Sequence, residues 1–285
     1  MVSKKGAALS SILAAVFLTT MKFVVGILTA SLGIISEALH SLLDMLAALI
    51  TFVAVSLSDR PADKEHQYGH GKIENLSAFF ESILLVITCI WIIYEAISRL
   101  VSGNTEIKVT IWSYIVVIIA MAIDLGRSRV LFRAAKEHNS QALEADAIHF
   151  STDILSSAVV LLGLICADFG YYTADAISAI GVAIIVLTIS YRLGKRAIDV
   201  LLDKVPKGLT EKIESKLQAN KDIVYHHNLK VRVAGADTFV EVNVHIRPNT
   251  DFETAHKICS EIEKDIATSI PRCITIVHPE PEENA

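Results

Sequence analysis

Six long apolar stretches fill the first two-thirds of the chain and dictate how it can fold. A helix needs about 20 apolar residues to cross the hydrocarbon core of a bilayer. Each stretch meets that length, and the six cover residues 8–32, 34–57, 76–100, 109–131, 142–167 and 174–192. Hydrophobic residues make up 52% of the 285 residues and charged residues 20%, which is too apolar for an ordinary soluble protein. We therefore predict an α-helical membrane protein with six transmembrane helices.

Positive charges in the loops predict which side of the membrane each helix end faces. Lys and Arg gather before the first stretch and in segments 59–72, 127–136 and 192–207, whereas the opposite loops hold only Arg99 and Lys108. Short loops rich in Lys and Arg stay in the cytoplasm. We therefore expect a multi-pass protein of the inner (cytoplasmic) membrane, with both termini in the cytoplasm. The net charge of −5 gives no indication of a nucleic-acid partner.

The chain after residue 205 has the pattern of a small soluble domain. Helical and strand patterns follow one another along it: 209–219 (helix), 230–233 and 238–246 (strands joined by a turn), 252–270 (helix) and 272–278 (strand). This α-β-β-α-β order predicts an α+β, metallochaperone-like sandwich with both helices on one face of a three-stranded sheet. We therefore divide the chain into a transmembrane transport domain, 1–205, and a cytoplasmic regulatory and dimerisation domain, 206–285. A domain of about 80 residues is marginal alone, so we expect it to pair with a second copy.

Two matched His-x-x-x-Asp pairs lie inside the second and fifth apolar stretches. His40 and Asp44 form the first pair, and His149 and Asp153 form the second. A spacing of four residues puts each pair on one helix face, and ionisable side chains inside a membrane are costly and usually functional. Two facing helices would supply two imidazole nitrogens and two carboxylate oxygens, which suit Zn²⁺ better than Mg²⁺ or Ca²⁺. The alternative is that each pair only forms an i,i+4 hydrogen bond within its own helix.

Histidines also gather outside the apolar stretches. In the loop after the second stretch, Asp63, His66 and His70 have a spacing that could hold one metal ion, although histidines in polar loops are commonly just solvated. Five of the ten histidines lie in the C-terminal tail, where metal binding and scattered surface histidine are both open interpretations. These five are His226, His227, His245, His256 and His278.

The whole chain resembles the cation diffusion facilitators. The six apolar stretches, the paired His and Asp residues, the Tyr-Gly-His-Gly-Lys segment at 68–72 and the α-β-β-α-β tail all match that family. The resemblance implies a homodimeric exporter of divalent metal ions driven by proton antiport, and hence a secondary active transporter and not an enzyme. It also implies an interlock between a loop lysine, Lys72, and an aspartate after the last span, Asp203.

By position, the resemblance implies three sets of metal ligands. The transport site inside the membrane falls on His40, Asp44, His149 and Asp153. The loop site falls on Asp63, His66 and His70. The cytoplasmic site at the dimer interface falls on His227, His256, His278 and Glu280. Asn243 stands where bacterial relatives have a ligand histidine, and His245 follows two residues later on the same strand face, so His245 joins the last set.

These features predict a Zn²⁺/H⁺ antiporter that exports zinc from the cytoplasm by alternating access. Metal ligands must lose their protons to bind, so cytoplasmic Zn²⁺ would displace protons from His40 and His149, and outside protons would later compete for the same ligands. With histidine at position 40, the set resembles the more zinc-restricted branch of the family. Zn²⁺ could also be a regulatory ligand that draws two C-terminal domains together.

Other functions fit the same residues. Mn²⁺, Fe²⁺, Co²⁺ and Cd²⁺ are alternative substrates, because sites of nitrogen and oxygen donors discriminate poorly among such metals. From different classes, an intramembrane metallohydrolase and a metal sensor without transport are also alternatives. A hydrolase would need an open coordination position and a general base, and the sequence has no His-Glu-x-x-His motif.

Overall fold

The structure, a computed structural model, describes residues 3–28, 32–102, 111–168 and 173–281. The chain forms two compact units. The first comprises Met1–Arg60 and Ile73–Ile198, and the second comprises Pro61–Lys72 and Asp199–Ala285. The loop that carries Asp63, His66 and His70 therefore folds with the C-terminal part of the chain.

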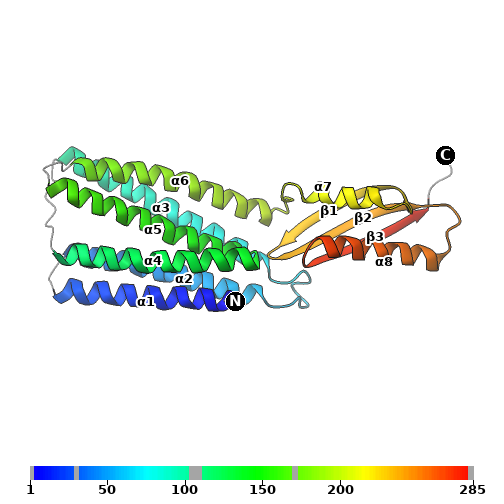
Figure 1. Ribbon diagram of the computed structural model, residues 1–285, viewed down its shortest axis with the longest axis horizontal. Coiled ribbons are helices and arrows are strands. Elements are labelled where there is room, and N and C mark those ends of the chain that lie inside the picture. Colours follow the sequence, from blue (N-terminus) through cyan, green and yellow to red (C-terminus); the bar gives the residue numbers. More distant parts are fainter. Residues whose placement is uncertain (1–2, 29–31, 103–110, 169–172, 282–285) are drawn as a thin grey trace. The chain divides into compact units, whose positions relative to one another are not determined.

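Six long helices run through the first unit (Figure 1). They are α1 (Lys4–Leu28), α2 (Leu32–Ser58), α3 (Lys72–Ser102), α4 (Ile111–His138), α5 (Gln141–Asp168) and α6 (Thr173–Leu201). Among the described residues, α1, α2, α3 and α6 contain segments long and apolar enough to cross a membrane. Each predicted stretch corresponds to one helix, and α4 is the helix whose apolar run is interrupted by both Asp124 and Arg127.

The first predicted stretch ends at a different residue from the helix that it matches. The first stretch was expected to run to residue 32, but α1 ends at Leu28 and α2 already begins at Leu32. Apolar side chains continue through both helices, so hydropathy alone does not reveal where one ends. The predicted start of the fourth stretch, Val109, and the loop residue Lys108 lie outside the described residues.

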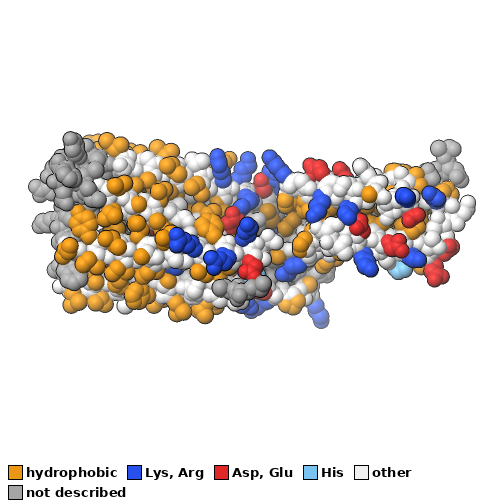
Figure 2. All heavy atoms as spheres, viewed as in Figure 1, with side chains coloured by type: hydrophobic (Ala, Val, Ile, Leu, Met, Phe, Trp, Pro, Cys, Tyr) orange, Lys and Arg blue, Asp and Glu red, His pale blue; other side chains and the backbone are white. Residues whose placement is uncertain are grey.

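The surface of these helices is apolar, as a lipid environment requires. Figure 2 shows hydrophobic side chains over much of the visible face of the first unit. Leu13, Phe17, Ile27 and Trp91 are each more than half exposed. Extensive apolar surface is unusual on a soluble protein, whereas helices in a bilayer present it to the acyl chains.

Small residues let the helices pack closely inside the first unit. Ala7 of α1, Ala134 of α4 and Ala147 of α5 are buried in one cluster, and Ala183 of α6 lies in another with residues of α3. Small side chains allow the backbones of membrane helices to approach one another. α2 also packs against α5, and these are the helices that carry the two His-x-x-x-Asp pairs.

The second unit contains two helices and one sheet. Its elements are α7 (Leu209–Ala219), β1 (Ile223–Ala234), β2 (Asp237–Ile246), α8 (Phe252–Ser269) and β3 (Cys273–Pro281). The sheet order is β1-β2-β3, with β1 antiparallel and β3 parallel to β2. Ile213 of α7 and Ile266 of α8 share one buried cluster with Val240, Val242 and Val244 of β2. The predicted α-β-β-α-β order with both helices on one sheet face is therefore confirmed.

Strand β1 begins earlier than its alternation pattern indicates. We expected a strand at 230–233, but β1 begins at Ile223. Its pairing with β2 is irregular between Ile223 and Tyr225 and again between His227 and Lys230. An irregularity of this kind shifts which side of the strand the next side chains face, so the first half of β1 lacks a regular apolar–polar alternation.

Candidate metal sites

The two His-x-x-x-Asp pairs meet between α2 and α5. Nε2 of His149 lies 3.2 Å from Oδ1 of Asp44 on α2 and 3.7 Å from Oδ2 of Asp153 on its own helix. His40 lies beside them, with its Nε2 3.9 Å from Asp44 Oδ1. Both distances within a helix exceed a hydrogen bond, whereas the contact between the helices does not. The side chains are therefore not arranged as two separate hydrogen-bonded pairs, each within one helix.

Burial differs across this cluster. The side chain of His149 is 7% exposed and that of His40 is 36% exposed, so His40 lies at the rim. The ligand atoms of Asp44, His149 and Asp153 all lie within 4.8 Å of one another. Two carboxylates this close repel each other unless a cation or protons compensate their charge. A divalent cation bound by these ligand atoms, or protons on them, would compensate that charge.

A second cluster lies in the loop between α2 and α3. Oδ1 of Asp63 accepts the backbone N–H groups of Glu65 at 2.9 Å and His66 at 2.6 Å. The bond from the His66 backbone, foremost, holds the pKa of Asp63 below its ordinary value. The imidazoles of His66 and His70 each place one nitrogen 3.4 Å from the Asp63 carboxylate. The loop thus holds one oxygen and two nitrogen donors close together.

Tyr68 anchors this loop within the second unit. The Tyr68 ring meets the Phe239 ring edge-on, with centroids 5.2 Å apart, and the guanidinium of Arg232 lies 3.3 Å from the Tyr68 centroid. The sequence pattern does not indicate these anchoring residues. Arg232 and Phe239 are distant from Tyr68 in the sequence and lie opposite each other in the β1–β2 register, so only the folded hairpin reveals the contact.

Lys72 and Asp203, the residues expected to interlock, lie together in the second unit. Nζ of Lys72 is 2.8 Å from Oδ1 of Asp203 and also donates to the carbonyl oxygen of Leu201 at 3.3 Å. This ion pair joins the first residue of α3 to the segment that follows α6. The two side chains are partly exposed, so the pair fixes a position more than it adds stability.

A third cluster lies on the sheet face that the helices leave open. His227, His245 and Glu280 come from β1, β2 and β3, and their ligand atoms lie within 4.8 Å of one another. Oε2 of Glu280 is 3.1 Å from Nε2 of His227 and 3.0 Å from that of His245. The hydrogen bond with His227, foremost, holds the pKa of Glu280 below its ordinary value. Asn243 also donates to Glu280, at 2.5 Å.

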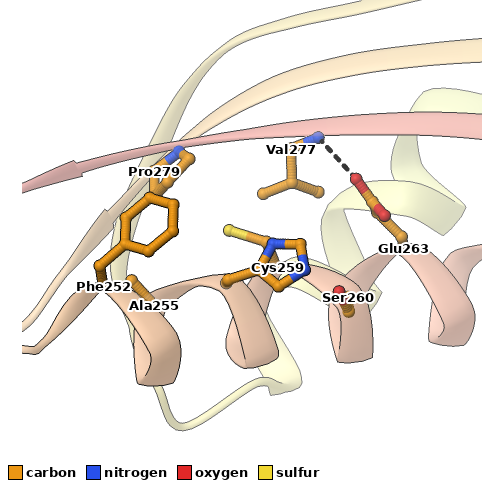
Figure 3. Close-up of a pocket in the computed structure, with 8 residues that line it drawn as sticks. Phe252, Ala255, Cys259, Ser260, Glu263, Val277 and Pro279 are labelled. Atoms are coloured by element: carbon orange, nitrogen blue, oxygen red, sulfur yellow. Dashed lines mark hydrogen bonds between the residues drawn. The ribbon is translucent and has the colours of Figure 1, made fainter.

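The other two expected cytoplasmic ligands are placed differently. His278 is on β3, and its Nε2 lies 3.8 Å from Oε1 of Glu280. His256 is on α8, which covers the opposite sheet face, and it lines a small cleft of about 210 Å³. Cys259 and Glu263 line the same cleft between α8 and β3 (Figure 3). Within one chain, the structure therefore does not bring His256 to the His227 cluster.

Comparison with known families covers nearly the whole chain. The family model described as "Cation efflux transmembrane domain" matches residues 8–202. The family model described as "Cation efflux protein, cytoplasmic domain" matches residues 205–282. The two matches correspond to the six long helices and to the α-β-β-α-β tail.

Individual relatives span the same length. An uncharacterized transporter of Methanocaldococcus jannaschii is 32% identical over 87% of this chain and 88% of its own. The cation-efflux pump FieF of Cronobacter sakazakii is 28% identical over 96% of this chain and 92% of its own. A solved structure of CzrB is 34% identical, covers 27% of this chain and 98% of its own, and has a TM-score of 0.27. The chain belongs to the cation diffusion facilitator family and is a multi-pass membrane transporter for cation efflux, not an enzyme.

Proposed function

We propose that this transporter exports Zn²⁺ from the cytoplasm in exchange for protons, by alternating access to one site formed by His40, Asp44, His149 and Asp153. The observation that carries the proposal is the contact between α2 and α5 at Asp44 and His149, 3.2 Å apart. The contact supports a single metal site whose ligands come from both helices. Movement of the two helices would change the side of the membrane from which this site is accessible.

The chemistry of the donors supports zinc as the substrate. Imidazole nitrogens and carboxylate oxygens are both ligands of Zn²⁺, and four such donors can complete the tetrahedral coordination that this ion adopts. Mg²⁺ and Ca²⁺ need more oxygen ligands than this cluster supplies. Mn²⁺, Fe²⁺, Co²⁺ and Cd²⁺ are competing substrates at such a site, because donor type alone separates these metals weakly.

The same donors support proton exchange. Imidazole and carboxylate groups must be deprotonated to bind a metal, so metal binding releases protons and proton binding releases metal. Histidine titrates near physiological pH, which lets a modest proton gradient shift this competition. Outward release of zinc would then be coupled to inward movement of protons.

We assign regulation and assembly to the second unit. The clusters at Asp63 and at His227 are partly exposed and lie outside the helices that carry the transport site, which supports sensing of metal instead of transport. Ile274 and Ile276 on the open sheet face are 55% and 60% exposed, and a second copy of the chain would cover them. His256 and His278 would complete the cytoplasmic site in such a homodimer.

The membrane orientation belongs to the same proposal. The excess of Lys and Arg on one set of loops supports cytoplasmic termini, and we place the protein in the inner membrane. We propose a transport domain, residues 1–205, and a regulatory and dimerisation domain, residues 206–285, with which the loop 61–72 folds.

The proposal is tested with purified transporter in proteoliposomes that enclose a zinc indicator and a pH indicator. We expect zinc addition to drive opposed zinc and proton fluxes, and Asp153→Ala to abolish both. Asp222→Asn, a change at an exposed turn residue that belongs to none of the three clusters, serves as the control and keeps both fluxes. Repeating the assay with Cd²⁺, Mn²⁺ and Fe²⁺ ranks the substrates.

Two results would contradict the proposal. Unchanged zinc-driven proton flux in Asp153→Ala would remove the assignment of the site. Zinc flux without any proton flux, in wild-type transporter, would remove the antiport mechanism while leaving metal transport in place.

A further inference from the structure

A buried arginine on α4 lies beside the segment of α5 that carries His149. Arg127 is 6% exposed, although a guanidinium inside a membrane helix bundle is costly and marks a functional candidate. Its partners come from three helices, α1, α4 and α5, and they account for the position of the side chain.

Two of these partners are hydrogen-bonding groups. Nη2 of Arg127 donates to the hydroxyl of Ser11 on α1 at 3.0 Å, and that hydroxyl donates to Oδ2 of Asp146 on α5 at 2.8 Å. A serine hydroxyl can accept and donate at once, so Ser11 links the guanidinium to a carboxylate that is fully buried. Nη1 of Arg127 also lies 3.3 Å from Oδ1 of Asp124.

The third partner is an aromatic ring. Cζ of Arg127 lies 3.4 Å from the ring centroid of Phe150, a cation–π contact in a dry environment. The Phe150 ring in turn meets the His149 ring edge-on, with centroids 5.3 Å apart. The neighbouring side chain, Ser128, donates to the carbonyl oxygen of Ala147 at 3.1 Å.

These contacts enclose one turn of helix. Asp146 and Phe150 are four residues apart, which is about one turn of α5, and His149 lies within that turn. Arg127 therefore holds the turn at both ends, through Ser11 at one and through the aromatic ring at the other. A lysine could supply the charge, but only a planar guanidinium stacks on a ring while donating in its own plane.

We propose that Arg127 is a positioning residue of the transport site, which fixes the Asp146–Phe150 turn so that Nε2 of His149 faces Asp44. This inference rests on the proposed function, because it takes His149 to be a metal ligand. Residues that orient metal ligands typically change metal affinity or activity by about 10- to 100-fold when they are replaced. Among the described residues, the hydrogen bonds and ring contact of Arg127 include none of the four proposed ligands, so Arg127 acts through the turn.

The test compares wild type, Arg127→Met, Arg127→Lys and Phe150→Leu with the double variant Arg127→Met/Asp146→Asn. Zinc flux in proteoliposomes gives the half-saturating Zn²⁺ concentration and the maximal rate, and thermal unfolding in detergent reports the fold. We expect Arg127→Met to raise the half-saturating concentration about 10- to 100-fold, and Arg127→Lys to recover part of that loss. Phe150→Leu weakens affinity in the same direction while leaving the Asp146 contact in place.

The double variant separates positioning from simple charge compensation. Without Arg127, the buried Asp146 carboxylate lacks a counter-charge, which destabilises the fold, and Asp146→Asn removes that charge. We expect the double variant to regain part of the lost thermal stability, because Asp124 still lacks its cation, but to keep the weakened zinc affinity. Recovery of both properties would show that Arg127 only compensates Asp146, and would overturn the inference.

The experiment gives one result if the positioning role of Arg127 is wrong and a different result if the proposed function is wrong. In one outcome, Asp153→Ala abolishes flux, but the half-saturating concentration stays at the wild-type value in Arg127→Met, Arg127→Lys and Phe150→Leu. This outcome contradicts the positioning role alone. If wild type transports no zinc, the proposed function falls. Titration of Zn²⁺ into the same variants, in a background with Asp63→Ala and His245→Ala, then decides the positioning role from binding alone.

Discussion

The guanidinium of Arg232 lies 3.3 Å from the ring centroid of Tyr68, and this contact joins the β1–β2 hairpin to the loop that carries the Asp63 cluster. His66 and His70 flank Tyr68 in the sequence, so the position of its ring restricts where both imidazoles can point. Coupling between two binding events is reciprocal. A metal ion in the loop and the packing of Tyr68 should therefore strengthen each other.

Replacing Tyr68 by leucine should weaken metal binding at the loop cluster. The change removes a cation–π contact worth about 0.5 to 2 kcal/mol, which limits the loss of affinity to at most about 30-fold. Equilibrium dialysis of Zn²⁺ with full-length protein that also carries Asp153→Ala and His245→Ala isolates this cluster. Tyr68→Phe keeps the ring and is the control, so it should bind Zn²⁺ with the affinity of the parent protein. The same affinity in Tyr68→Leu would contradict a positioning role for the ring.

Replacing Gly71 by alanine should release the loop from the hairpin. A Cβ at this position would collide with the carbonyl oxygen of Ala234 and lie 2.7 Å from the carbonyl carbon. These are backbone atoms, which cannot move away as the end of a flexible side chain can. We expect faster proteolysis within residues 61–72 and a lower thermal midpoint for the full-length protein. Gly126→Ala is the matched control, because nothing lies within 4 Å of its added Cβ, and equal proteolysis of the two variants would contradict the close approach.

Local patterns in the sequence predicted most of the fold. The helix at Leu209–Ala219 was predicted with the observed bounds, because the helical spacing of Leu209, Ile213 and Leu217 is a local signal. The first half of β1 was missed, because its pairing irregularities remove the alternation on which the prediction depended. The end of the first long helix was misplaced for another reason: the three residues between Leu28 and Leu32, Thr-Ala-Ser, include no charge, glycine or proline that would mark a helix boundary in the sequence.

Contacts between distant segments are what the sequence could not provide. The spacing of His149 and Asp153 predicts that they share a helix face, but it does not predict that His149 lies nearer to Asp44 than to Asp153. Likewise, Glu280 faces His245 because β3 pairs with β2 in a register that sets these residues opposite each other. The family resemblance grouped His256 with them, whereas the path of α8 takes it to the other face of the sheet within one chain.

Asp251 should stabilise α8 in a pH-dependent way. The side chain of Thr254, foremost, and its backbone N–H hold the pKa of Asp251 below its ordinary value of 3.8, with Thr254 N at 3.0 Å from Oδ1. A group whose pKa is lowered by folding stabilises the fold above its unfolded pKa, and loses that effect as pH falls through the folded value. Asp251→Ala should therefore speed hydrogen exchange in the first turn of α8 several-fold at neutral pH.

The difference between Asp251→Ala and wild type should shrink as the pH falls below 3.8, because the wild-type carboxylate then becomes protonated. Hydrogen exchange of α8 measured by mass spectrometry over this pH range checks the sign. Asp222→Asn is the control for removing an acidic group without removing a helix cap. A difference that grows on acidification would contradict the capping role.

Replacing His40 by aspartate should change which metals are carried. His40 lies at the rim of the transport cluster, with its side chain 36% exposed and its Nε2 3.9 Å from Asp44, so a shorter carboxylate can enter there without disturbing His149. Oxygen donors favour harder cations such as Mn²⁺, and imidazole favours Zn²⁺. We expect the ratio of Mn²⁺ to Zn²⁺ flux in proteoliposomes to rise severalfold in His40→Asp. His226→Asp, outside all three clusters, should leave the ratio unchanged, and an unchanged ratio in His40→Asp would mean that position 40 does not contact the transported ion.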